Sequence, residues 1–386
     1  MKVLLIAKTL SKGGAASGAL NLIHALRSAG ADVTALDAGV CMKGHPMTLL
    51  RNLERVCERI FYGGETHFLR LGPPVFDLIK LYDRYKPDVI QLCDVSGNII
   101  RFSDIDKVGC TVVHRMSDFW PYNGAHHYSE FFPEKLDFAD IMLRKLIFDS
   151  SVMPSWRVAP SQWLANLVDG KNIKVIRNAV VLPSVEPRVD LMRSKLRFGF
   201  ISAQVMDVRK GFMALPRLLE HFSRKTQRDI ELHVFGRKPK NGIPSIKGVY
   251  TKCHGVYSRD SLEHVYECFD ILLCPSAQDN SPNVLTEALA HGVPVIAQIG
   301  TGMDSYIKKD TGALIDFRAV EGDVNMEFSD AVRDVVSDYV NFSAKARLYA
   351  ATELCPKFIG EQYFKLYSIF NVAVADDIVN CENHWH

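Results

Sequence analysis

Residues 271–299 read ILLCPSAQDNSPNVLTEALAHGVPVIAQI and predict one complete strand–helix–strand unit. The apolar run at each end is typical of a buried strand. Ser281 suits the N-cap of a helix and Pro282 suits its first turn, so we expect the helix to begin at about Pro282. Gly292 followed by Pro294 predicts its end. Two strands joined by such a crossover helix are parallel neighbours.

The same rhythm runs along the chain. Strand-like runs begin at Lys2, Asp32, Asp88, Cys110, Trp156 and Lys174, and again at Arg197, Glu231, Ile271, Pro294 and Gly312. Because these runs are almost continuously apolar rather than alternating, both faces of each strand should be buried, as in a parallel sheet covered by helices. The predicted fold class is therefore α/β, with two doubly wound, Rossmann-like domains in series.

Length also favours two domains, because 386 residues exceed the usual size of one core. Prolines near the middle of the chain indicate a linker. We predict an N-terminal domain over 1–182, a linker over 183–195, a C-terminal domain over 196–355 and a closing helix with tail over 356–386. Ligands of such sheets bind beyond the carboxyl ends of the strands, so we expect a substrate in a cleft between facing domains.

Composition and charge narrow the classes of function. A hydrophobic fraction of 47%, a charged fraction of 23% and a formal net charge of +2 fit a globular enzyme and do not call for nucleic acid as a partner. Nine cysteines without a C-x-x-C pair fit neither a disulfide framework nor a zinc site and suggest a reducing compartment, hence the cytoplasm. The N-terminal apolar run predicts a first strand, and no run approaches a membrane span.

Two acids flank the predicted helix start. Asp279 lies in the loop before it, and Glu287 lies inside it with a side chain that leans back toward the N-terminus. A helix start that follows a parallel strand binds anions such as phosphate. Carboxylates on either side of a phosphate fit a nucleotide sugar, whose ribose and hexose hydroxyls flank the diphosphate. The alternative is that both acids are solvated surface residues.

This stretch resembles the signature of retaining glycosyltransferases of family 4, which have the two-domain GT-B fold with a C-terminal helix that crosses back to the first domain. An acid, seven residues and a Glu precede a Gly-x-Pro-Val segment in that family, matched here by Asp279, Glu287 and HGVPVIA, although many members carry Glu in place of Asp279. The segment MDVRKGF resembles the family's basic loop. The resemblance implies that Arg209 and Lys210 grip the diphosphate and stabilise the leaving group, without a metal ion or another cofactor.

The resemblance also implies which groups contact the donor. Asp279 would contact the hexose and Glu287 the ribose. Backbone groups would contribute at Gly13 and Gly14 in the first Gly-rich turn, at the helix start Asn283, Val284 and Leu285, and at Gly255 and Val256 beside the nucleobase.

A second segment resembles the colanic-acid, capsule and O-antigen branch of this family. It matches that branch at Asp118, Trp120, Gly124, His127 and Tyr128. Ser117 stands where the branch has a histidine that orients or polarises the transferred sugar, and a histidine occurs at His114 instead. Whether His114 or His127 takes that catalytic role is left open.

The resemblance implies transfer of a hexose from a nucleoside diphosphate sugar to a saccharide or lipid-linked saccharide in bacterial surface polysaccharide biosynthesis. UDP is the favoured nucleotide, with GDP-mannose and GDP-fucose as alternatives. A basic stripe at Arg51, Arg55 and Arg59, within residues 43–70, would place the protein peripherally on the cytoplasmic face of the inner membrane. Glu54 and Glu58 also fit an ordinary salt-bridged surface helix.

Other functions remain as alternatives. A metal-dependent GT-A transferase would use Asp104 and Asp106 as its D-x-D motif, but Ser103 and Asp104 resemble a helix cap rather than a strand end. A protein that binds the donor without turnover is a third hypothesis. An NAD-dependent dehydrogenase is disfavoured, because neither half offers G-x-G-x-x-G after its first strand.

Overall fold

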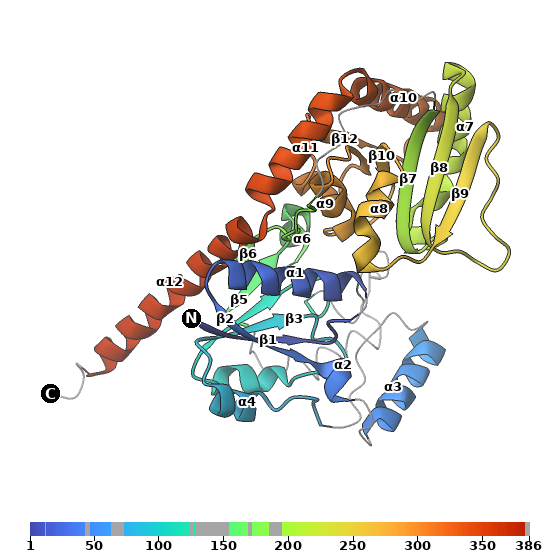
Figure 1. Ribbon diagram of the computed structural model, residues 1–386. Helices are drawn as coiled ribbons and strands as arrows, with labels where there is room; N and C mark the ends of the chain where they lie inside the picture. The colour runs from blue at the N-terminus through green and yellow to red at the C-terminus, as the bar shows by residue number, and fades with distance from the viewer. Residues whose placement is uncertain are drawn as a thin grey trace. The chain divides into compact units, whose positions relative to one another are not determined.

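The computed structural model describes residues 1–11, 13–42, 47–62, 73–122, 127, 154–168, 172–184 and 195–382 (Figure 1). The chain divides into two compact units. Unit 1 comprises Met1–Ala179 and Pro356–His386, and unit 2 comprises Val180–Cys355. The chain thus forms most of unit 1, builds unit 2 without interruption and returns to unit 1 at Pro356.

Unit 1 contains a six-stranded parallel sheet in the order β2-β1-β3-β4-β5-β6. Its strands are β1 Lys2–Ala7, β2 Asp32–Asp37, β3 Val89–Cys93, β4 Thr111–Arg115, β5 Trp156–Ala159 and β6 Ile173–Val175. Its helices are α1 Gly14–Ser28, α2 Ala38–Cys41, α3 Met47–Tyr62, α4 Leu78–Tyr85, the 3-10 helix η1 Phe102–Lys107, α6 Gln162–Leu167 and α12 Pro356–Glu382. Each strand predicted in this part of the sequence is present.

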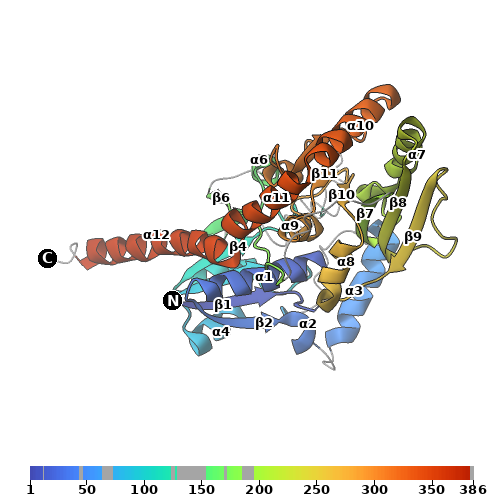
Figure 2. The same cartoon turned by 45° about the horizontal axis from the view of Figure 1, so that its top comes forward.

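Helices cover both faces of this sheet. Apolar residues of α1 and α12 share one core with β1, β3 and β4, while α4 and η1 pack on the opposite face. Helices α1 and α12 lie side by side in Figure 2. A Cβ atom at Gly360 of α12 would lie 2.0 Å from the carbonyl oxygen of Ala25, so only glycine permits this close approach.

Unit 2 contains a second six-stranded parallel sheet, in the order β12-β11-β10-β7-β8-β9. Its strands are β7 Lys195–Gln204, β8 Asp229–Arg237, β9 Val249–Gly255, β10 Ile271–Cys274, β11 Val295–Gln298 and β12 Gly312–Ile315. Its helices are α7 Leu215–Thr226, α8 Leu262–Glu267, α9 Asn283–Ala290, α10 Glu321–Ser337 and α11 Tyr339–Glu353, with short 3-10 helices η4 Val208–Lys210, η5 Phe212–Ala214, η6 Arg259–Ser261 and η7 Gly302–Ser305.

The sheet of unit 2 is also covered on both faces. Helices α7 and α10 pack on one face, and α8, α9 and α11 pack on the other. The α/β fold class with two doubly wound parallel sheets is therefore confirmed. The sequence analysis did not predict strand β9, because this edge strand mixes partly buried and exposed residues and lacks a continuous apolar run.

Helix α9 begins one residue after the predicted start of about Pro282. The helix begins at Asn283, and Pro282 takes the N-cap position with an extended backbone. Ser281 precedes the N-cap, and its hydroxyl group donates to the Tyr306 hydroxyl at 2.6 Å. Tyr306, which lies 25 positions away in the sequence, thus binds the side chain that the local pattern assigned to the cap.

Candidate functional site

The carboxyl ends of β7 and β10 meet at the point where the strand order of unit 2 reverses. From β7 the chain proceeds outward to β8 and β9, and then returns to place β10 on the other side of β7. Open α/β sheets bind ligands at such a switch point. The loop after β7 carries Arg209 and Lys210, and the loop after β10 carries Asp279, so the fold brings these three predicted site residues together.

Asp279 accepts charge-assisted contacts from both basic residues. Lys210 Nζ donates to Asp279 Oδ2, and Arg209 Nη1 lies 3.8 Å from the same oxygen. Arg209 Nη1 also donates to the carbonyl oxygen of Gln278 at 3.0 Å. The side chains of Arg209, Lys210 and Asp279 retain 18%, 22% and 12% of their exposure, so the cluster is largely desolvated but still reachable.

Gly211 lets these two loops approach. Its backbone has φ of 73°, and a Cβ atom built there would lie 2.2 Å from the carbonyl oxygen of Pro275. The backbone N–H of Ala277 donates to the carbonyl oxygen of Arg209 at 2.8 Å, which ties the loop after β10 to the basic loop. The positions of both cations therefore depend on a glycine that accepts a left-handed conformation without a side chain.

The first turn of α9 follows this cluster directly. Asn283, Val284 and Leu285 form it, and their predicted contact with the donor stays a prediction. The N–H group of Leu285 donates to the carbonyl oxygen of Pro282 at 3.0 Å, so it is already used within the turn. Pro282 at the N-cap offers no side-chain hydrogen bond to this end of the helix.

Glu287 lies one turn further into α9 and is buried. Tyr266 Oη lies 2.9 Å from Glu287 Oε2 and 3.0 Å from the carbonyl oxygen of Val284. Burial raises the pKa of the Glu287 carboxyl above its ordinary value, against the opposing effects of the Tyr266 hydroxyl and the Arg259 cation. A buried carboxyl group at a helix start is not an ordinary solvated surface residue, which disfavours the alternative interpretation of Glu287.

The segment after β9 lies near this carboxyl group. Gly255 ends β9 with φ of 78°, and the side chain of Val256 is 72% exposed. Burial, and then the charge of Glu287, raise the pKa of the Tyr257 hydroxyl. The sequence analysis did not identify Tyr257, Arg259 and Tyr266 as site residues. Aromatic and basic residues are common in this part of the sequence, and only the fold brings these three to Glu287.

Unit 1 has a polar cluster at its own switch point, between β1 and β3. Lys8, directly after β1, donates to Ser96 Oγ at 2.7 Å, and Ser96 Oγ donates to Asp94 Oδ1 at 2.8 Å. Burial opposes ionisation of Asp94, but Lys8 and Ser96 outweigh it and hold the pKa of that carboxyl below its ordinary value. These three residues were also missed, although two of them immediately follow predicted strands.

His127 forms an ion pair with Asp118, with 2.6 Å between His127 Nδ1 and Asp118 Oδ2, and its ring stacks on Trp120. Burial disfavours the imidazolium, but the Asp118 carboxylate outweighs burial and raises the pKa of His127. Gly124 and Tyr128, which matched the same motif, lie outside the described residues. Ser117 lies 3.5 Å from Arg115 Nη1.

His114 has a different environment. It is a buried residue of β4, its Nδ1 atom contacts the Tyr122 hydroxyl, and burial lowers its pKa to about 3. A neutral imidazole inside the sheet favours a structural role, so His127 is the better candidate of the two. Gly13, with φ of 95°, occupies the N-cap of α1, and Gly14 is the first residue of that helix.

Two further sequence predictions concern unit 1. Asp104 is buried and forms an ion pair with Lys107 at 2.9 Å, whereas Asp106 is exposed, and both lie within η1 after the N-cap Arg101. The cap predicted at Ser103 and Asp104 is therefore wrong, because the 3-10 helix begins earlier.

Helix α3 covers part of the predicted membrane segment. Arg55 is exposed and Glu54 is buried, while the side chains of Arg51, Glu58 and Arg59 lie outside the described residues. Among the described residues, no helix combines the length and apolar character needed to cross a bilayer.

Comparison with known proteins gives the following matches. Residues 196–338 match the family described as "Glycosyl transferases group 1". A search of curated proteins gives no match. Among solved structures, sucrose-phosphate synthase from Thermosynechococcus elongatus is similar over 97% of this chain and 100% of its own, with 14% identity and a TM-score of 0.65.

Two other solved structures are also similar. Alr3699/HepE of Anabaena in complex with UDP and glucose covers 95% of this chain and 99% of its own, with 15% identity and a TM-score of 0.61. The lipopolysaccharide outer core galactosyltransferase WaaB covers 96% and 99%, with 15% identity and a TM-score of 0.57.

The fold of this chain is that of the GT-B glycosyltransferases, and residues 196–338 match a glycosyltransferase family. The expectation of a transferase is confirmed, and the findings support a nucleotide-sugar glycosyltransferase. The GT-A alternative with Asp104 and Asp106 is wrong, because the chain has two parallel sheets of the GT-B kind.

Proposed function

We propose that this protein is a retaining glycosyltransferase of family 4 that transfers a hexose from a UDP-sugar to a saccharide or lipid-linked saccharide of a bacterial surface polysaccharide. GDP-mannose and GDP-fucose remain the alternative donors. The main support for this proposal is the cluster at the switch point of unit 2, formed by Arg209, Lys210 and Asp279. This cluster adjoins the first turn of α9 and the buried Glu287. A UDP complex of the similar protein Alr3699/HepE supports UDP over GDP.

The cluster matches the charge pattern of such a donor. Arg209 and Lys210 supply two cations for the diphosphate, and their charge stabilises the leaving group as the glycosidic bond breaks. The Asp279 carboxylate, which these cations now contact, accepts hydrogen bonds from hexose hydroxyls. Glu287 accepts hydrogen bonds from the ribose. Positive charge from side chains makes a metal ion unnecessary for this step.

Retention of configuration follows if both bonds change on one face of the hexose. The bond between the anomeric carbon and the diphosphate oxygen breaks, and a bond from the acceptor oxygen forms on the same face. The proton of the acceptor hydroxyl group passes to the departing diphosphate. No enzyme nucleophile is required. The family resemblance assigns His127, which pairs with Asp118, to orient the transferred sugar.

We also propose that α3 rests on a membrane that holds a lipid-linked acceptor. Leu49, Leu53, Val56 and Ile60 are exposed and recur at helical spacing, so they form one apolar face. Vesicles of anionic lipid should sediment the full chain, and Leu53→Asp should abolish sedimentation. Leu348→Asp, at an exposed position of α11, is the matched control. Equal sedimentation of both variants would contradict membrane contact through α3.

Calorimetry with UDP, GDP and NAD, without added metal, tests the donor site. We expect UDP to bind wild type and Glu287→Gln to weaken binding about tenfold or more, as expected for one hydrogen bond to a charged group. Glu267→Gln, an exposed acid on α8, should leave binding unchanged. Binding of neither diphosphate, or an unchanged affinity of Glu287→Gln, would overturn the site.

Turnover distinguishes an enzyme from a binding protein that has lost its chemistry. Wild type should release UDP from a UDP-hexose in the presence of acceptor, and NMR of the product should show the anomeric configuration of the donor. Tight binding of UDP-hexoses without release of UDP would favour the binding protein. An inverted product would contradict a retaining mechanism.

A further inference from the structure

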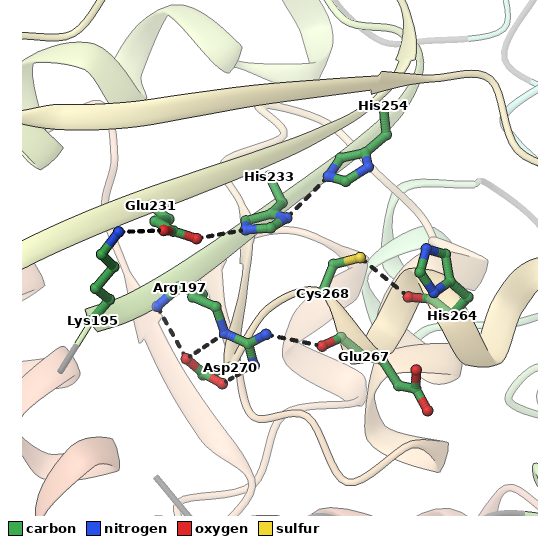
Figure 3. A network of polar contacts seen from close by, with 9 residues as sticks. All are labelled: Lys195, Arg197, Glu231, His233, His254, His264, Glu267, Cys268 and Asp270. Carbon is green, nitrogen blue, oxygen red and sulfur yellow. Dashed lines mark hydrogen bonds and ion pairs between the residues drawn. The ribbon is translucent and has the colours of Figure 1, made fainter. Parts of the chain in front are cut away.

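Three side chains with metal-ligating atoms converge in unit 2, and none of them belongs to the proposed donor site. They are His233 on β8, His254 on the edge strand β9 and Cys268 at the C-cap of α8 (Figure 3). One potential ligand atom from each lies within 4.8 Å of the other two. His233 is buried, and the other two are partly buried.

The spacing fits a small ion that prefers nitrogen and sulfur ligands. His233 Nδ1 and His254 Nε2 are 3.0 Å apart. In a tetrahedral zinc site, with Zn–N bonds of about 2.0–2.1 Å and a Zn–S bond of about 2.3 Å, two nitrogens are about 3.3 Å apart and nitrogen and sulfur about 3.6 Å apart. The two nitrogens are already close to this separation, and the Cys268 sulfur, within 4.8 Å of both, would move toward the ion on binding.

The surroundings already orient both imidazole rings. His233 Nε2 lies 3.3 Å from Glu231 Oε2, and Glu231 is held in turn by Lys195 at 3.0 Å (Figure 3). A carboxylate on one ring nitrogen is the usual partner of a metal-binding histidine, because it directs the other nitrogen toward the ion. The His254 ring stacks on Phe235, with 4.2 Å between ring centroids and an angle of 7°.

We propose that His233, His254 and Cys268 bind one Zn²⁺ ion through Nδ1, Nε2 and Sγ, with water as the fourth ligand. Binding replaces the hydrogen bond between the two rings. It also releases the Cys268 thiol proton, which is now directed at the His264 carbonyl oxygen at 3.2 Å, to solvent. Two imidazoles and one thiolate suit zinc, whereas Mg²⁺ and Ca²⁺ prefer oxygen ligands.

The ion would have a structural role. Among the described strands, β9 is the last strand of its sheet and pairs only with β8. A metal ion held by β8, β9 and the end of α8 would fix this edge and add its binding energy to the folded state. This role is independent of the proposed transferase chemistry, which uses no metal.

Metal titration of the full-length protein tests the proposal. After removal of metals with a chelator, Zn²⁺ is titrated in competition with a chromogenic chelator, and Co²⁺ is added separately as a spectroscopic probe. We expect Cys268→Ser to bind one Zn²⁺ fewer than wild type, or to bind Zn²⁺ at that site with an affinity that is at least tenfold lower. Co²⁺ in the wild type should show a thiolate-to-metal charge-transfer band and the intense visible bands of a tetrahedral site.

Matched variants isolate the cluster. Cys253→Ser changes the exposed cysteine next to His254, and His264→Gln changes a histidine of α8 outside the cluster, so both should retain the ion. His254→Gln should lose it, which gives a second measurement if Cys268→Ser fails to fold. Metal bound elsewhere, for example at the histidines of the terminal sequence CENHWH, survives in both cluster variants and cancels in the difference.

Thermal unfolding gives an independent result. Zn²⁺ should raise the midpoint temperature of unfolding of wild type and of Cys253→Ser, but not that of His254→Gln. The proposal is overturned if wild type and the cluster variants bind equal amounts of Zn²⁺ with equal affinity, or if Co²⁺ gives no thiolate band. His233 and His254 would then be a hydrogen-bonded pair without a metal ion.

Discussion

Lys210 donates to Asp279 across the two loops that follow β7 and β10, so a cation expected to bind the diphosphate holds the acid expected to bind the hexose. Arg209 lies 3.8 Å from the same carboxylate oxygen. In the proposed donor complex, these contacts are exchanged for contacts with the donor: phosphate takes the cations, and the hexose hydroxyls take the carboxylate. This exchange predicts opposite effects of one substitution on binding and on turnover.

Asp279→Asn should strengthen binding of UDP, which lacks a hexose, because the cations no longer pair with a carboxylate. A partly exposed ion pair contributes about 0.2–1 kcal/mol, so we expect the Kd to fall by up to about fivefold. Turnover of the UDP-hexose should fall about a hundredfold, since the hexose loses a charged acceptor. Calorimetry and release of UDP measure the two effects. Weaker UDP binding would show that Asp279 does not compete with the diphosphate.

Lys210→Gln should weaken the binding of UDP about tenfold. The affinity for uridine, which has no phosphate, should stay within about twofold of wild type. The reason is that the Lys210 ammonium is expected to contact only the diphosphate. Lys225→Gln, at an exposed position of α7, serves as the control for loss of one positive charge. If uridine and UDP weaken equally, Lys210 acts through the structure of the loop rather than on phosphate.

Gly211→Ala should destabilise unit 2 and weaken UDP binding together. The new Cβ atom would lie 2.2 Å from the Pro275 carbonyl oxygen, in addition to the strain of φ at 73°. Gly242 has φ of 77°, and a Cβ atom there would have no neighbour within 4 Å, so Gly242→Ala isolates the strain alone. Urea unfolding should show that the free energy of unfolding falls by about 1 kcal/mol for Gly242→Ala and by at least about 3 kcal/mol for Gly211→Ala. Equal losses would mean that the two loops separate without cost.

Glu287→Gln should stabilise the protein increasingly as pH rises. Burial raises the pKa of Glu287 above its ordinary value of 4.5, so the folded state holds this proton more tightly than the unfolded state does. Wild-type stability is consequently lost as pH rises above 4.5 through the raised pKa, whereas a neutral amide loses none. The amide oxygen still accepts from Tyr266. Urea unfolding at pH 4, 6 and 8 should show a growing advantage of the variant, and a constant difference would contradict the burial argument.

Asp118→Asn should lower the pH at which His127 titrates, because burial then acts without the opposing carboxylate. In wild type the raised pKa gives stability that is present below the unfolded value of 6.5 and is lost as pH rises through the folded pKa. NMR of the labelled imidazole measures the midpoint pH of the His127 titration directly. An unchanged His127 midpoint would show that the Asp118 contact does not persist in solution.

The sequence was sufficient for elements whose cause is local. Strands such as β1 and β10 are continuous apolar runs, so their burial on both faces could be predicted without any partner. Strand β9 failed this test, since its stability comes from pairing with β8 rather than from its own pattern.

The sequence by itself determined the alternation of buried strands and helices and the short segment that carries Asp279 and Glu287, because both are encoded by neighbouring residues. Only the tertiary structure decided which side chains meet. Lys8 reaches Ser96 across 88 positions, Lys210 reaches Asp279 across 69, and His233 reaches His254 across 21. The physical reason is that parallel strands bring the ends of distant segments to one edge of a sheet, and no local spacing records which ends become neighbours.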